Sequence, residues 1–223
     1  MLPLLSTLPH ANAHFRVAGP VGDLEVQWIW PPTASPDGIS AFAVICHPHP
    51  LHGGTMQNKV VTTLTRVYKQ LGIPCACFNF RGVGQSAGDY AEGEGEQGDL
   101  AAVVSGIRQH CPQATVHLAG FSFGAYVAAM QAETLGAASL LTVAPPVGRF
   151  PMERVVTTPR PWYIAVPLAD EVVNPVAMMS FVKRLVPAAT VMTYPETSHF
   201  FHGKLVDLQR DLIAAWQAQD PAK

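Results

Sequence analysis

The sequence predicts an α/β fold with a mostly parallel central sheet, an antiparallel N-terminal hairpin and helices on both faces of the sheet. Short runs rich in β-branched and apolar residues alternate along the chain with longer segments whose apolar residues recur at helical spacing. Several of the short runs are apolar throughout, which is typical of strands buried on both faces of a parallel sheet. Together these observations indicate repeated βα units.

The composition fits one compact domain. The chain has 223 residues, of which 48% are hydrophobic and 13% charged, so it can bury a substantial core. We expect a single domain over residues 1–223, with residues 1–12 as a loosely ordered N-terminal extension. The formal net charge is -2 and no run of Lys or Arg is present. Neither nucleic acid nor an anionic membrane is therefore expected as a partner.

The N-terminal residues and the cysteines indicate the expected cellular location of the protein. Residues 1–5 are briefly apolar but lack a basic segment and a cleavage site, so no signal peptide is expected. No stretch approaches the roughly 20 apolar residues that a membrane-spanning helix needs. The four cysteines occupy apolar runs or the end of a predicted helix, as small core residues do. We therefore expect a cytoplasmic protein, with the oligomeric state left open.

The expected elements begin with a hairpin. Its strands cover residues 13–18 and 23–30, joined by the Gly- and Pro-containing residues 19–22. A buried strand at 40–46 precedes the first crossover helix at 58–71, where apolar residues recur at helical spacing. The remaining strands are expected at 73–80, 115–119, 138–143, 162–166 and 190–194, and the remaining helices at 97–110, 125–135, 175–185 and 204–219.

The strongest functional signal is the segment Gly120-Phe121-Ser122-Phe123-Gly124. It follows the strand expected at 115–119 and precedes the helix expected at 125–135. A strand-to-helix turn this tight forces its central residue into a strained conformation, and the flanking glycines remove the Cβ atoms that would clash. The alternative is a Gly/Ser turn without chemistry, but the strand–turn–helix context favours a nucleophilic serine.

A serine hydroxyl is a poor nucleophile at neutral pH, so it needs a histidine base and a carboxylate, in the chain order Ser, Asp/Glu, His. Asp170 follows one predicted strand and His199 follows the last one. Glu171 is the alternative acid, and Asp170 is favoured because it is nearer the strand end. His202 is the alternative base, but it lies beside the next helix and is expected to be a cap or surface residue.

Three histidines share one loop after the strand at 40–46. His47, His49 and His52 have the spacing of a metal-binding cluster in binuclear metallo-hydrolases, but Leu51 stands where the aspartate ligand is needed. We therefore expect no metal. In a serine hydrolase the same loop supplies a backbone N–H to the oxyanion hole, and Gly53 with Gly54 gives it the backbone freedom to do so.

The oxyanion hole needs two backbone donors. One is expected to be the N–H of Phe123, directly after the nucleophile and at the positive end of the next helix dipole. The other is expected from His49 or Leu51, because Pro48 and Pro50 have no N–H. The sequence does not decide between the N–H groups of His49 and Leu51.

Two segments lack regular patterning. Residues 82–95 are Gly-rich and acidic and are expected to form a long loop over the carboxyl edge of the sheet. Residues 144–161 carry five prolines and no convincing helix. In a hydrolase of this topology a lid would be inserted in this second segment, which is short. We therefore expect a minimal lid or none.

With these residues in view, the chain resembles the small, lidless α/β-hydrolases of bacteria. The resemblance runs from about Gly19 to Trp216. It implies an α/β-hydrolase fold, an esterase-like activity, the triad Ser122, Asp170 and His199, and no cofactor. One departure is that such families carry Gly-Asp/Glu-x-Asp where Pro167-Leu168-Ala169-Asp170 keeps only the last aspartate. The resemblance is carried by residues 47–61, 79–84, 120–124 and 198–201, in that order.

The sequence thus predicts a serine hydrolase that acts on small or water-soluble carboxylic esters or thioesters through an acyl-enzyme on Ser122. Its expected partner is a small acyl substrate. Two alternatives stay open. One is a catalytically idle binding protein, because a fold alone does not guarantee activity. The other is a metal-dependent hydrolase that uses His47, His49 and His52.

Overall fold

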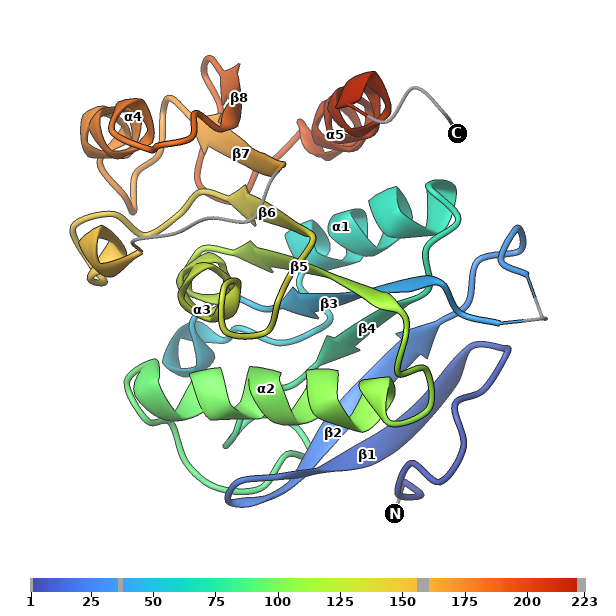
Figure 1. Ribbon diagram of the computed structural model, residues 1–223. Helices are drawn as coiled ribbons and strands as arrows, with labels where there is room; N and C mark the ends of the chain where they lie inside the picture. Colours follow the sequence, from blue (N-terminus) through green and yellow to red (C-terminus); the bar gives the residue numbers. More distant parts are fainter. Residues whose placement is uncertain (1, 36–37, 156–160, 220–223) are drawn as a thin grey trace.

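The computed structural model describes residues 2–35, 38–155 and 161–219 (Figure 1). Within these residues, eight strands form one sheet in the order β1-β2-β4-β3-β5-β6-β7-β8. β1 (Ala13–Gly19) and β2 (Gly22–Ile29) form an antiparallel hairpin, and β2 is also antiparallel to β4 (Cys75–Phe78). All later pairs are parallel. The predicted fold class is therefore confirmed.

All the expected strands and helices are present, with ends that differ by a few residues. Two short 3-10 turns, η1 (Pro50–His52) and η2 (Met152–Arg154), were not predicted. The second lies in the segment 144–161, whose residues 156–160 are outside the described part. The other strands are β3 (Ala41–Cys46), β5 (Thr115–Phe121), β6 (Ser139–Val143), β7 (Trp162–Pro167) and β8 (Thr190–Tyr194), and the helices are α1 (Lys59–Gln70), α2 (Glu94–Arg108), α3 (Phe123–Gln131), α4 (Pro175–Lys183) and α5 (Leu205–Gln219).

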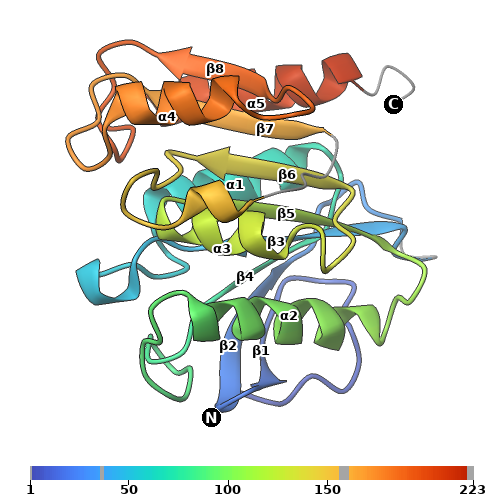
Figure 2. The same cartoon turned by 60° about the vertical axis from the view of Figure 1, so that its left-hand side comes forward.

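The helices cover both faces of the sheet. α1 and α5 pack together on one face, while α2, α3 and α4 lie on the other (Figures 1 and 2). Each face has its own apolar cluster. Leu64 and Leu208 belong to the cluster under α1 and α5, and Val103, Val127 and Phe181 belong to the one under the other three helices. This three-layer arrangement buries the parallel strands on both sides, as their continuous apolar runs require.

The last two residues of the loop predicted over 82–95 belong to a helix instead, because α2 begins at Glu94. Gly93 adopts a left-handed conformation (φ 87°) at the N-cap. The Glu96 carboxylate then accepts the backbone N–H groups of Ala91 (2.8 Å) and Gly93 (2.7 Å). These bonds satisfy amides just before the helix, so the helix starts three residues earlier than the apolar periodicity indicated.

The N-terminal segment runs beside the hairpin. Leu4 pairs with Arg16 in an isolated bridge, and the Leu5 N–H donates to the Arg16 carbonyl at 2.8 Å. The indole N–H of Trp28 donates to the carbonyl of Pro9 at 2.9 Å. Pro3, Leu5 and Pro9, within the segment expected to be loosely ordered, are thus hydrogen-bonded to β1 or β2.

The four cysteines, Cys46, Cys75, Cys77 and Cys111, are all buried and unpaired, as expected for core residues. In the described part of the chain, none of the helices combines the length and apolar character needed to cross a bilayer. Because β3 and β5 to β8 run parallel, the loops that follow them gather at one edge of the sheet. That edge carries the residues singled out above.

Candidate active site

Ser122 occupies a strained turn between β5 and α3. Its backbone angles are φ 52° and ψ -118°, a conformation that costs a non-glycine residue about 1–3 kcal/mol. A Cβ atom at Gly120 would lie 2.2 Å from the carbonyl oxygen of Gly124, and one at Gly124 would lie 2.3 Å from that of Cys46. Both flanking positions therefore require glycine. The Ser122 N–H donates to the Val143 carbonyl at 2.9 Å, which anchors the turn to β6.

The structure brings Ser122, His199 and Asp170 into one hydrogen-bonded chain. The Nε2 atom of His199 lies 2.9 Å from the Ser122 Oγ, and its Nδ1 atom lies 2.7 Å from the Asp170 Oδ2. The His199 side chain is 2% exposed and that of Asp170 is fully buried. The three residues come from the loops after β5, β8 and β7, so the sheet topology assembles them.

The carboxylate of Asp170 is held by its own turn. Its Oδ1 atom accepts the backbone N–H groups of Val172 and Val173, both at 2.7 Å. Its Oδ2 atom is left for His199. Since an ionised carboxylate only accepts hydrogen bonds, the Nδ1 of His199 must carry the proton. The Nε2 of a neutral His199 is then free to accept the Ser122 hydroxyl proton, and the departure from the family pattern before Asp170 leaves this geometry intact.

Glu171, the alternative acid, contacts the backbone of His199 and not its ring. Its Oε2 atom accepts the His199 N–H at 3.1 Å. Sequence reasoning missed this contact, although two successive carboxylates after β7 were a signal that both could reach the histidine loop. His202, the alternative base, packs against the ring of Phe200 with centroids 6.0 Å apart.

The three histidines of the β3 loop do not converge on a common point. His47 is fully buried and uses both ring nitrogens: Nδ1 donates to the Pro48 carbonyl (2.6 Å) and Nε2 accepts the Phe80 N–H (3.0 Å). Burial lowers the pKa of His47 to about 4. The His49 and His52 rings stack on one another, with centroids 4.3 Å apart. Among the described residues, no group of three or more His, Cys, Asp or Glu is placed to hold a metal ion.

The two candidate donors of this loop differ in their hydrogen bonds. The Leu51 N–H donates to the Nδ1 of His49 at 3.2 Å, in the first turn of η1. Within the described residues, the N–H groups of His49 and Phe123 make no hydrogen bond. The His49 ring also contacts the Phe123 ring, with centroids 5.2 Å apart. A Cβ at Gly54 would lie 2.0 Å from the Pro48 carbonyl oxygen, so only glycine lets the loop fold back here.

His49 is further tied to the segment before α2. Its Nε2 atom lies 3.1 Å from the hydroxyl of Tyr90. Because Nδ1 already accepts the Leu51 N–H, the Nε2 of a neutral His49 carries the proton and donates it to Tyr90. Burial, and then the neighbouring His52, lower the pKa of His49. The neutral form that this pattern needs is therefore favoured.

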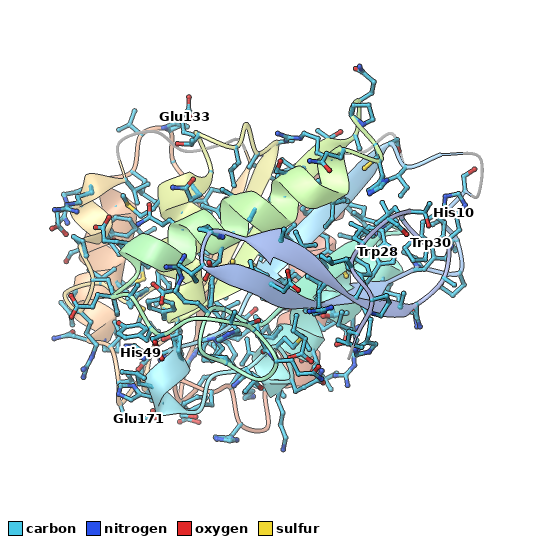
Figure 3. All side chains as sticks on the ribbon, turned by 90° about the horizontal axis from the view of Figure 1, so that it is seen from below. His10, Trp28, Trp30, His49, Glu133 and Glu171 are labelled. Carbon is cyan, nitrogen blue, oxygen red and sulfur yellow. The ribbon has the colours of Figure 1, made fainter. Side chains whose placement is uncertain are left out.

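A cleft of about 310 Å³ opens onto Ser122 and His199, at the lower end of the size range of ligand sites. His49, Asn58, Val172 and Phe200 are among the other residues that line it. Figure 3 labels His49 and Glu171, which lie in the same corner of the molecule. A larger cavity of about 480 Å³ is lined by residues within 30–35, 38–41 and 70–74, but its described lining residues include no His, Cys, Asp or Glu. The smaller cleft is therefore the candidate site.

Comparison with known proteins agrees with this description. Residues 43–222 match the model of the alpha/beta hydrolase family. A crystal structure from Xanthomonas campestris, described as an a/b serine hydrolase without lid, is 40% identical, with a TM-score of 0.92 over 98% of this chain and 100% of that one. An alpha-beta serine hydrolase homologue from Coxiella burnetii is 42% identical, with a TM-score of 0.88 over 94% and 99%.

A curated relative, an uncharacterized protein of Rickettsia prowazekii, is 32% identical over 174 residues, which are 75% of this chain and 71% of that protein. The family match covers most of the sheet and all the loops that carry Ser122, Asp170 and His199. The chain therefore belongs to the alpha/beta hydrolase family.

Proposed function

We propose that this protein is a serine hydrolase that cleaves small or water-soluble carboxylic esters or thioesters through an acyl-enzyme on Ser122. The observation that carries the proposal is the chain of short hydrogen bonds from Ser122 through His199 to Asp170. Its support is twofold: the serine lies in a strained elbow that exposes its hydroxyl to a cleft, and its imidazole partner is held in the tautomer that a base requires.

In the proposed mechanism, the Ser122 Oγ forms a bond to the acyl carbon while His199 takes the hydroxyl proton on Nε2. The resulting imidazolium is stabilised by the Asp170 carboxylate, and it then protonates the leaving alcohol or thiol as the bond to the acyl carbon breaks. A water molecule, deprotonated by the same imidazole, then attacks the acyl-enzyme. The bond between the acyl carbon and Ser122 Oγ breaks as the imidazolium returns its proton to Oγ, which releases the acid and regenerates the serine. Every proton passes through one ring nitrogen.

The carbonyl oxygen becomes negative in the tetrahedral intermediate and needs donors. We assign this role to the backbone N–H groups of Phe123 and His49. The N–H of Leu51 is the poorer candidate because it already donates to the His49 ring. Losing one such donor typically costs about 3 kcal/mol of transition-state stabilisation. The ring contact between His49 and Phe123 supports a placement of both residues beside the same oxygen.

The cleft favours a small substrate. Its volume of about 310 Å³ suits a short acyl or alcohol group better than a long lipid chain. Phe200 is 38% exposed and, with Val172, offers apolar surface for such a group. We therefore place short, water-soluble esters and their thioester analogues first among candidate substrates.

The test is covalent labelling followed by turnover. Wild-type protein is treated with a fluorophosphonate probe beside S122A, and peptide mass spectrometry locates the adduct. We expect labelling at Ser122 that is absent from S122A, and hydrolysis of p-nitrophenyl esters with rates that fall as the acyl chain lengthens. A wild-type protein that forms no adduct and turns over neither esters nor thioesters would be a binding protein of this fold, and the proposal would be rejected.

A further inference from the structure

The loop that carries His199 has little regular structure of its own. It connects β8 to α5, and both Glu196 (φ 52°) and Phe201 (φ 55°) are in the left-handed region. Non-glycine residues in such conformations are strained and persist only where the surroundings hold them. The position of the His199 backbone therefore depends on bonds from outside the loop.

Those bonds come from the loop after β7. The Leu168 N–H donates to the Tyr194 carbonyl at 2.9 Å, and the Ala169 N–H donates to the Thr197 carbonyl at 3.1 Å. The Glu171 Oε2 then accepts the His199 N–H at 3.1 Å. The first two bonds fix residues that precede His199 in its loop, whereas the third fixes the backbone of His199 itself.

Asp170 and Glu171 thus act on different parts of one residue. Asp170 bonds the ring at Nδ1 and limits its rotation. Rotation about the side chain is not the only freedom that moves Nε2, because a shift of the backbone carries the whole ring with it. The Glu171 bond removes that second freedom. Reacting groups need near-attack geometry, and a displacement of about 1 Å can cost about 100-fold in rate.

On this basis we infer that Glu171 is a positioning residue, whose carboxylate fixes the backbone of His199 so that Nε2 stays within reach of the Ser122 hydroxyl. The inference rests on the proposed function of Ser122. Glu171 is exposed, so solvent screens its charge. Its effect therefore comes from the reach and acceptor oxygen of the side chain and not from its charge.

Three variants separate these properties. E171Q keeps the length and an acceptor oxygen but removes the charge. E171D keeps the charge but is one methylene shorter, and E171A removes both. E196Q is the matched control, because Glu196 is an exposed carboxylate on the loop that carries His199 but does not accept the His199 N–H. All four are compared with wild type by kcat and KM for one p-nitrophenyl ester, by the rate of fluorophosphonate labelling, and by thermal unfolding.

We expect kcat and the labelling rate to fall about tenfold in E171A and E171D, with KM unchanged, because these variants lose the hydrogen bond to the His199 backbone. Both rates should stay within about twofold of wild type in E171Q and E196Q. Hydrogen exchange of the peptide that contains residues 195–201 should also accelerate in E171A and E171D. This readout does not depend on catalysis.

The inference is overturned if E171A matches the active wild type in kcat and labelling. It is also overturned if E171Q is as impaired as E171A while E171D is not, because charge would then be the cause. A wild-type protein that is neither labelled nor active rejects the proposed function instead. In that case, the exchange of the 195–201 peptide still decides whether Glu171 holds the His199 backbone.

Discussion

The imidazole of His47 links two loops, since its Nε2 atom accepts the Phe80 N–H at 3.0 Å while its Nδ1–H donates to the Pro48 carbonyl at 2.6 Å. Only the neutral ring can make both bonds, because protonation of Nε2 removes the acceptor for the Phe80 N–H. The loop that contains Pro48 and His49 is thereby joined to the segment that follows β4. The placement of the proposed oxyanion donor therefore depends on a buried histidine that has no role in the proposed reaction.

This arrangement predicts a loss of stability in mild acid. Burial holds the pKa of His47 at about 4, below the ordinary histidine value of 6.5. Between these values the unfolded chain binds a proton that the folded chain does not, so the stability from this group is lost as the pH falls from 6.5 to about 4. The loss reaches about 3 kcal/mol. Urea unfolding at pH 7 and pH 4.5 measures most of this loss.

H47Q is the control for this prediction. Glutamine can still accept the Phe80 N–H but does not titrate, so the free energy of unfolding of H47Q should change less between the two pH values than that of wild type. If both proteins lose the same stability, other groups cause the acid sensitivity and His47 does not.

Alanine substitutions at Gly53 and Gly54 separate the effect of backbone strain from the effect of a steric clash that displaces the loop. Gly53 has φ 75° with open space around its Cβ position, so G53A should cost about 1 kcal/mol of stability with little effect on turnover. A Cβ at Gly54 would meet the Pro48 and His49 carbonyls at 2.0 and 2.6 Å. G54A should therefore move the loop and lower kcat by about 100-fold. Equal turnover in the two variants would show that this loop does not contribute to the oxyanion hole.

The D170N variant tests the tautomer of His199. The amide oxygen can keep accepting the N–H groups of Val172 and Val173, so the melting temperature should stay close to that of wild type. The amide NH₂ would then face Nδ1 and force the proton onto Nε2, which leaves no acceptor for the Ser122 hydroxyl. We expect kcat to fall about 10⁴-fold. Turnover near the wild-type rate would show that Asp170 is not the orienting acid.

The loop that carries His49 and Gly54 is also held by a buried pair of side chains, Asn79 and Glu25. Asn79 donates to the Glu25 carboxylate at 2.8 Å and accepts the Met56 N–H at 2.9 Å. N79D keeps the acceptor but turns a carboxylate toward Glu25, so we expect about 3 kcal/mol of lost stability at pH 7. The double variant E25Q/N79D restores a donor and an acceptor and should recover most of it in chemical unfolding. Additive losses would contradict this pairing.

Much of the fold could be predicted because its signals are local. The apolar run at 41–46 and the helical spacing at 59–70 depend only on side-chain polarity along a few turns or residues. The elbow at Ser122 was equally accessible, since glycine on both sides of a serine between a strand and a helix has few other uses. That Ser122, Asp170 and His199 meet could also be predicted, because parallel strands place the loops that follow them at one edge of the sheet.

The tertiary structure decided how neighbouring candidates divide their roles. Asp170 and Glu171 are adjacent carboxylates, and only the packing of the β7 loop against the β8 loop determines that one reaches the ring of His199 and the other its backbone. Likewise, the sequence could not separate His49 from Leu51, or show that His47 is bonded at both nitrogens. Hydrogen bonds between residues far apart along the chain depend on distance and direction in space, and no local pattern of polarity records those.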